Sequence, residues 1–290
     1  MNELKEKAWA KLNISLDVLA RRADGYHDLA MVMQTVSLRD EVTVRFTEGE
    51  AVRAVTSMGF IPGDERNLAV KAAKAFFAEA ALPVRGMEIE IEKNIPVGAG
   101  LAGGSADAGA VLRALNRAFG QPLDRAGLIA AAERTGSDVA FCTLGGTMLA
   151  QGRGERLTAL TPMPDCVYVI VMPDFSISTP ELFRKIDGKR LRCHPDTAGI
   201  VSALEAGDLR GICRRMYNVF EDADDRRMRT VAEIRSRLLD GGALGAVMTG
   251  TGSAVFGVFE DDAAARKTAG ALRKDYRMAV TAENVSAAAD

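Results

Sequence analysis

Residues 96–105 read Pro-Val-Gly-Ala-Gly-Leu-Ala-Gly-Gly-Ser, a glycine-rich turn at the predicted start of a helix. Glycines let the backbone turn tightly and leave its N–H groups open to a bound anion. The helix behind them adds unsatisfied N–H donors and the positive end of its dipole. No charged residue lies between Lys93 and Asp107. We therefore expect this glycine loop to hold phosphate mainly through its backbone.

Two common nucleotide-binding loops fit the stretch less well. Residues 98–103 match G-x-G-x-x-G, but the predicted strand Met87–Glu92 carries a glutamate at every second position, and Asp124 starts a helix instead of ending a strand. A P-loop needs a lysine before Ser105, and Gly104 stands there. The plainest alternative is a ligand-free turn capped by Ser105. Four glycines exceed what capping requires, which favours phosphate binding.

The flanking pattern predicts alternating strands and helices. Strict alternation from Ala8 to Leu19 predicts a strand with one buried face, whose other face carries Lys11 and Asn13. Further segments are expected as helices at 67–82, 105–119 and 261–274, as strands at 144–150 and 167–172, and as a buried strand–turn–strand at 241–259. A change to Pro-rich sequence after residue 155 suggests two domains, 1–155 and 156–290.

Composition narrows the classes of partner. The 290-residue chain is 48% hydrophobic and 26% charged, with a net charge of −2, so we expect no nucleic-acid or membrane binding. No stretch is apolar enough to predict a membrane segment, and the mixed charges of the first seven residues do not resemble a signal peptide. Four separated cysteines and two histidines predict no metal site and reduced thiols in the cytoplasm. A monomer or weak homodimer is expected.

Three motifs together resemble the GHMP kinases, which include galactose, homoserine and mevalonate kinases. They are Ala10-Lys11-Leu12-Asn13, the glycine loop Pro96–Ala106, and a C-terminal glycine loop, Met248–Phe256. The resemblance implies an α+β, two-domain GHMP kinase fold. Its N-terminal domain would be a ribosomal-protein-S5-domain-2-like α/β domain, and its C-terminal domain a ferredoxin-like α+β domain.

A narrower resemblance within the family rests on the run Arg22–Leu29 and on Gly136-Ser137-Asp138-Val139. It implies that the chain uses ATP and Mg²⁺ to phosphorylate the 2-hydroxyl of 4-diphosphocytidyl-2-C-methyl-D-erythritol, in the non-mevalonate route to isoprenoids. Two alternatives stay open: a kinase for another small alcohol, such as homoserine or mevalonate, and a non-catalytic nucleotide-binding protein of the same fold.

The resemblance assigns the ATP phosphates to the whole glycine loop. Its residues are Pro96, Val97, Gly98, Ala99, Gly100, Leu101, Ala102, Gly103, Gly104, Ser105 and Ala106. Two positions depart from the family pattern. Ala102 stands where many members have glycine, and Ala106 stands where many have serine, which leaves Ser105 as the only hydroxyl of the loop.

The catalytic pair implied by the resemblance is Lys11 and Asp138. A carboxylate is ionised at neutral pH and can accept the proton of the attacking hydroxyl. Lys11 beside it would favour the carboxylate form and orient the hydroxyl or a phosphate. From the residues alone, Asp138 also fits a helix N-cap, and Lys11 also fits a solvated lysine on a strand.

Substrate-binding roles fall on Asn13, Tyr26, His27 and Phe183. Asn13 would position the erythritol part, Tyr26 and Phe183 would stack on the cytosine, and His27 would hydrogen-bond its edge. A structural polar residue and a core phenylalanine are the alternatives for Asn13 and Phe183.

The resemblance implies that Asn67 and Lys93 contact the adenine of ATP. Asn67 is also a plausible helix N-cap, and Lys93 also fits an ordinary surface lysine.

Overall fold

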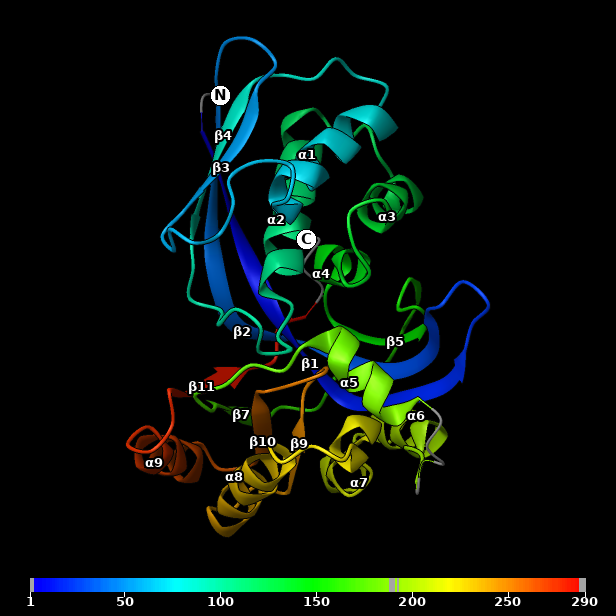
Figure 1. Cartoon of the computed structure of the whole chain (residues 1–290), viewed down its shortest axis with the longest axis vertical. Coiled ribbons are helices and arrows are strands. Elements are labelled where there is room, and N and C mark those ends of the chain that lie inside the picture. Colours follow the sequence, from blue (N-terminus) through cyan, green and yellow to red (C-terminus); the bar gives the residue numbers. More distant parts are fainter. Residues whose placement is uncertain (1–2, 188–190, 192, 287–290) are drawn as a thin grey trace.

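The computed structural model describes residues 3–187, 191 and 193–286. Its strands form two sheets, and helices cover each of them, as Figure 1 shows. This mixed arrangement is the predicted α+β class. All four cysteines are free thiols. Among the described residues, no helix is long and apolar enough to cross a membrane.

The first sheet is built around a long antiparallel hairpin, in which β1 and β2 pair from Glu3–Arg45 to Arg21–His27. Its strand order is β3-β4-β2-β1-β8, and β5 joins β2 to β6. The strands are β1 (Glu3–Arg21), β2 (His27–Phe46), β3 (Val52–Thr56), β4 (Met87–Glu92), β5 (Thr147–Gly152), β6 (Arg156–Ala159) and β8 (Tyr217–Asn218). The helices beside it are α1 (Leu68–Glu79), α2 (Gly103–Ala118), α3 (Arg125–Glu133) and α4 (Val139–Leu144).

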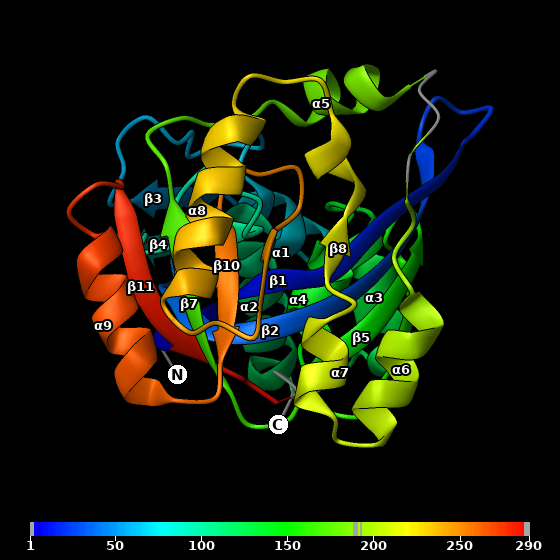
Figure 2. The same ribbon diagram turned by 90° about the horizontal axis from the view of Figure 1, so that it is seen from below.

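The second sheet is antiparallel throughout, in the order β11-β7-β10-β9. Its strands are β7 (Val167–Met172), β9 (Gly245–Met248), β10 (Val255–Phe259) and β11 (Met278–Glu283). The remaining helices are α5 (Thr179–Ile186), α6 (Thr197–Glu205), α7 (Leu209–Cys213), the 3₁₀ helix η1 (Val219–Asp222), α8 (Met228–Asp240) and α9 (Asp262–Leu272). Figure 2 shows α8 and α9 on the outer face of this sheet. The predicted strand at 167–172 and the strand–turn–strand at 241–259 are confirmed.

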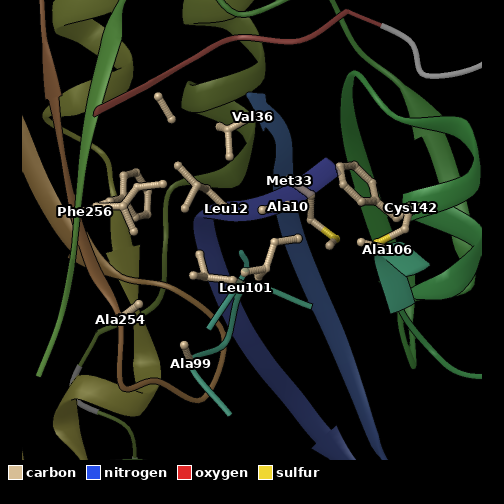
Figure 3. Packing of buried hydrophobic residues seen from close by; sticks show 14 of the residues in the cluster. Ala10, Leu12, Met33, Val36, Ala99, Leu101, Ala106, Cys142, Ala254 and Phe256 are labelled. Atoms are coloured by element: carbon tan, nitrogen blue, oxygen red, sulfur yellow. The ribbon is translucent and has the colours of Figure 1, made fainter. Parts of the chain in front are cut away.

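The strand β1 is buried on both faces between Lys11 and Val18, so the prediction of a single buried face is wrong. Leu12, on the apolar face, lies on the same side of the hairpin as Phe256 of β10 in Figure 3. The C-terminal glycine loop covers the polar face, where the N–H of Gly250 and the hydroxyl of Thr249 are hydrogen-bonded to Asn13. As a consequence, even Asn13 is fully buried.

Several element boundaries differ from the sequence prediction, and two of them lie next to the site. Helix α2 begins at Gly103, two residues before the predicted start at Ser105. Helix α4 continues to Leu144, so the strand expected at 144–150 lies at Thr147–Gly152. The domain division after residue 155 stays a prediction. Strand β6, which follows it, still pairs with β5 of the first sheet.

Candidate active site

A cavity of about 1010 Å³ lies beside the β1–β2 hairpin and is lined by residues from both the N-terminal and the C-terminal parts of the chain. The glycine loop and the start of α4 line it, together with α5, the β1–β2 turn and the C-terminal glycine loop. Its charged lining is mostly cationic, although the chain as a whole has a net charge of −2. The cations are Lys11, Arg21, Arg66, Lys93, Arg153 and Arg184, and the carboxylates are Asp107, Asp138 and Asp187. This lining suits an anionic ligand.

The glycine loop ends in an uncapped helix. Ala102 is the N-cap of α2, at φ +58°, and it makes no side-chain capping bond, so the reading of Ser105 as the cap is wrong. Within the described part of the chain, no acceptor is found for the backbone N–H groups of Gly103, Gly104 and Ser105, all of which line the cavity. Free N–H donors at the start of a 16-residue helix fit a phosphate group.

The glycine loop packs backbone to backbone against the C-terminal glycine loop. The N–H of Ala254 donates to the carbonyl of Ala99 at 3.1 Å, and the hydroxyl of Thr249 lies 3.4 Å from the carbonyl oxygen of Gly100. Gly100 has φ +80°, and a Cβ there would collide with the carbonyl oxygen of Thr249. Glycine is therefore required at position 100 both by the dihedral angle and by the close approach.

Lys11 and Asp138 meet inside the cavity. Lys11 Nζ lies 3.7 Å from Asp138 Oδ2, and the side chain of Lys11 is 5% exposed, so it is not a solvated strand lysine. Asp138 stands at the N-cap position of α4, but its carboxylate makes no capping hydrogen bond. That carboxylate is 31% exposed and faces the cavity. The aspartate is thus available to a ligand, with a buried cation beside it.

Asn13 connects Lys11 to the C-terminal glycine loop. Its side-chain oxygen accepts hydrogen bonds from Lys11 Nζ at 2.6 Å and from the N–H of Gly250 at 2.9 Å. Its backbone N–H donates to the hydroxyl of Thr249. The side chain is fully buried and is absent from the cavity lining. In this structure Asn13 has the structural role, and its contact with substrate stays a prediction.

The far end of the cavity carries the aromatic residues. His27 Nε2 is hydrogen-bonded to Asp187 Oδ1 at 2.7 Å, and its ring stacks on Phe183 with centroids 4.5 Å apart. Phe183 packs edge-on against Phe220 but still lines the cavity, so it is not simply a core residue. Tyr26 is 56% exposed, and no contact joins it to Phe183 among the described residues. The observed stack pairs His27 with Phe183, and the roles of Tyr26, His27 and Phe183 toward cytosine stay predictions.

The two residues expected near adenine lie close to the glycine loop. Asn67 caps α1 by accepting from the N–H of Ala69 at 2.9 Å, as the capping alternative predicts. Lys93 is 8% exposed, so the surface-lysine alternative is wrong. Its ammonium donates to Asp40 and to Asp107, at 2.5 and 2.6 Å. Both Asn67 and Lys93 line the cavity, and their contact with adenine stays a prediction.

Burial governs the protonation of the cluster formed by Lys93, Asp40 and Asp107. Burial raises the pKa of Asp107 to about 7, against the opposing charge of Lys93. For Lys93, burial would lower the pKa, but the charges of Asp107 and Asp40 outweigh it and the pKa is raised. One oxygen of Asp107, Oδ1, is buried and has no hydrogen-bond partner among the described residues.

Comparison of the sequence with known proteins identifies the family. The GHMP kinases N terminal domain matches residues 67–146, and the GHMP kinases C terminal domain matches residues 200–277. The chain is 44% identical over 256 residues to a 4-diphosphocytidyl-2-C-methyl-D-erythritol kinase of Clostridium tetani, covering 88% of this chain and 91% of that protein. The chain belongs to the GHMP kinase family.

The fold of this GHMP kinase also resembles solved structures of kinases. A crystal structure of a 4-(cytidine 5'-diphospho)-2C-methyl-D-erythritol kinase superposes with a TM-score of 0.80 at 33% identity, covering 98% of this chain and all of that one. A homoserine kinase from Cytophaga hutchinsonii gives a TM-score of 0.76 at 22% identity, covering 99% and 96%. The second likeness shows the shared fold alone.

Several residues of this GHMP kinase site were missed by sequence reasoning. Asp187 orients His27, Asp107 pairs with Lys93, and Arg153 lines the cavity beside Tyr26. Asp187 and Arg153 lie in charged turns that resemble ordinary solvated loops. Asp107 did carry a signal, because a carboxylate one turn inside an apolar helix needs a partner when it is buried.

Proposed function

We propose that this GHMP kinase transfers the γ-phosphoryl group of ATP to the 2-hydroxyl of 4-diphosphocytidyl-2-C-methyl-D-erythritol, giving the 2-phosphate and ADP. One observation carries the proposal: the Lys11–Asp138 pair lines the same cavity as the uncapped start of α2 and the His27–Phe183 stack. A phosphate site, an acid–base pair and an aromatic base site therefore share one cavity. The similarity to kinases named for this substrate supports the choice of alcohol.

The reacting groups fit a direct displacement. Asp138 accepts the proton of the 2-hydroxyl while the oxygen bonds to the γ-phosphorus and the bond to the β-phosphate oxygen breaks. Lys11, held by Asn13, keeps its ammonium beside Asp138 and near the C-terminal glycine loop. There it offsets the negative charge that collects on the transferring phosphoryl group.

The glycine loop holds the nucleotide phosphates through backbone N–H groups. We propose Mg²⁺ as the companion of ATP, because it is bound in most kinases by one or two protein ligands and by the phosphates themselves. The described residues contain no cluster of three His, Cys, Asp or Glu side chains that could form a metal cage. The Ser105 hydroxyl, in the cavity lining, is the candidate protein ligand, and the ion would supply charge neutralisation.

The aromatic end supplies the recognition of cytosine. A ring stacked on Phe183 gains dispersion energy, and His27, fixed through Asp187, presents a hydrogen-bonding edge. Neither homoserine nor mevalonate contains a ring that would use these groups.

The experiment compares three alcohols at equal concentrations of ATP and Mg²⁺, following the release of ADP. We expect kcat/KM for the diphosphocytidyl substrate to exceed the values for homoserine and mevalonate by at least ~10³-fold, since unpaired polar groups reject the wrong ligand strongly. Equal or higher turnover with homoserine or mevalonate overturns the proposed substrate. Absence of turnover with all three supports the non-catalytic alternative.

A further inference from the structure

The proposed substrate, on which this inference rests, carries two phosphates between its cytosine and its reactive hydroxyl. If cytosine lies at the His27–Phe183 end and the hydroxyl lies at Asp138, the diphosphate must cross the space between them. Its negative charges lose hydration in the cavity, so a cation on this path would stabilise the bound substrate.

Most cations of the cavity already have carboxylate partners. Lys11 is paired with Asp138, Arg21 with Asp187, Arg66 with Asp64, and Lys93 with Asp40 and Asp107. Arg153 and Arg184 form no ion pair with any described residue. The guanidinium groups of these two arginines are therefore available to bind an anionic ligand.

Arg153 lies in a turn that approaches both Tyr26 and Asp138. It lies in the turn between β5 and β6, and its guanidinium carbon is 5.2 Å from the ring centre of Tyr26. The next residue, Gly154, passes beside the catalytic pair, because a Cβ there would lie 4.0 Å from Asp138 Oδ1. The turn therefore joins the aromatic end of the cavity to the phosphoryl-acceptor end.

Arg184 is placed differently. Its Nε donates to the carbonyl of Pro180 within its own helix, α5. No contact among the described residues brings it to Asp138 or to Tyr26. The observations therefore favour Arg153 over Arg184.

We propose that the guanidinium of Arg153 binds the diphosphate of the substrate and so selects a cytidine diphosphate ester over an uncharged cytidine. The planar guanidinium can offer two parallel N–H donors to phosphate oxygens while its face stays against Tyr26. The same contact would hold Tyr26 toward the cavity. Arg153 is a substrate-binding residue in this account and takes no part in the proton transfer.

The test measures binding of cytidine, CMP and CDP to the wild-type chain and to Arg153→Ala by calorimetry. We expect the substitution to weaken CDP ~10–100-fold and cytidine less than ~2-fold, the range for a lost charge-assisted contact. The KM for the diphosphocytidyl substrate rises by a similar factor, and the KM for ATP stays unchanged. Arg153→Lys recovers part of the loss. Arg156→Ala, an exposed arginine three residues on and outside the cavity, serves as the matched control.

Two results would overturn the inference while leaving the proposed function intact. Unchanged CDP affinity in Arg153→Ala excludes a diphosphate contact. An equal loss for cytidine and CDP shows that Arg153 acts only by holding Tyr26. A wild-type chain that fails both to bind CDP and to turn over the diphosphocytidyl substrate contradicts the proposed function itself, and with it the inference.

Discussion

Lys11 of β1 and Asp138 at the start of α4 meet in the cavity, with 3.7 Å between Lys11 Nζ and Asp138 Oδ2. The ammonium is held from behind by Asn13, which itself is tied to Gly250 of the C-terminal glycine loop. The catalytic pair is thus braced by both parts of the chain. Its geometry depends on contacts that no local sequence pattern reveals.

Asn13→Ala tests whether Asn13 braces the site or binds the substrate. Removing the amide leaves the N–H of Gly250 without its acceptor and frees Lys11 to move. We expect unfolding free energy to fall by ~1–3 kcal/mol, the cost of a buried unsatisfied group. We also expect kcat to fall with little change in substrate KM. Thermal unfolding and steady-state kinetics check this. A raised substrate KM with unchanged stability would restore the substrate-binding role.

Gly100→Ala tests the contact between the two glycine loops. The added methyl group would strike the carbonyl of Thr249, and alanine disfavours φ +80°. Strain and overpacking together cost ~3 kcal/mol or more, so we expect a lower unfolding midpoint and weakened ATP binding. Gly98→Ala is the matched control: its φ is +71°, but the nearest side-chain atom, Ser176 Cβ, is 3.4 Å away. Equal losses in the two variants would show that the dihedral angle alone matters.

The sequence predicted which motifs line the cavity better than it predicted how they pack. The glycine loop, Lys11 and Asp138 lie in short motifs whose chemistry is local. By contrast, the burial of both faces of β1 and the pairing of Lys93 with Asp40 depend on segments far apart in the chain. Alternation in β1 shows a polar face, but it does not show that another part of the protein covers that face.

The start of α2 illustrates a second limit of sequence reasoning. Ser105 is the usual residue type for an N-cap, yet Ala102 occupies that position with φ +58°. A non-glycine residue in the left-handed region is uncommon, so residue preferences point to the wrong cap. The leftover N–H groups of Gly103 and Gly104 are better explained by a ligand than by helix propensity.

Phe183→Ala tests the aromatic end of the cavity. The ring stacks on His27, and its loss removes the surface on which the cytosine is expected to lie. We expect the KM for the diphosphocytidyl substrate to rise ~10-fold, as for loss of a base-stacking side chain, while the KM for ATP is unchanged. Tyr26→Phe keeps its ring and should behave as the wild type. A parallel rise of both KM values in Phe183→Ala would argue against a specific cytosine site.

Asp107→Asn tests the buried charge cluster through its pH dependence. Burial raises the pKa of Asp107 to about 7 in the folded chain, above its ordinary unfolded value. Its ionisation therefore costs stability, and the cost grows as the pH rises from about 4 to about 7. As the pH increases from 5 to 8, the unfolding midpoint of the variant should therefore increase relative to that of the wild type. A difference that stays constant or falls over this range would mean that Lys93 keeps Asp107 ionised throughout.

Steady-state turnover of Asp138→Asn, measured together with ATP affinity, tests whether Asp138 is the general base. Asparagine preserves the shape of the side chain but cannot take the hydroxyl proton. We expect kcat with the diphosphocytidyl substrate to fall ~10²–10⁴-fold, as for loss of a general base, while the Kd for ATP changes less than ~2-fold. Wild-type kcat in this variant, or a collapse of ATP binding, would contradict the assignment of Asp138 as the base.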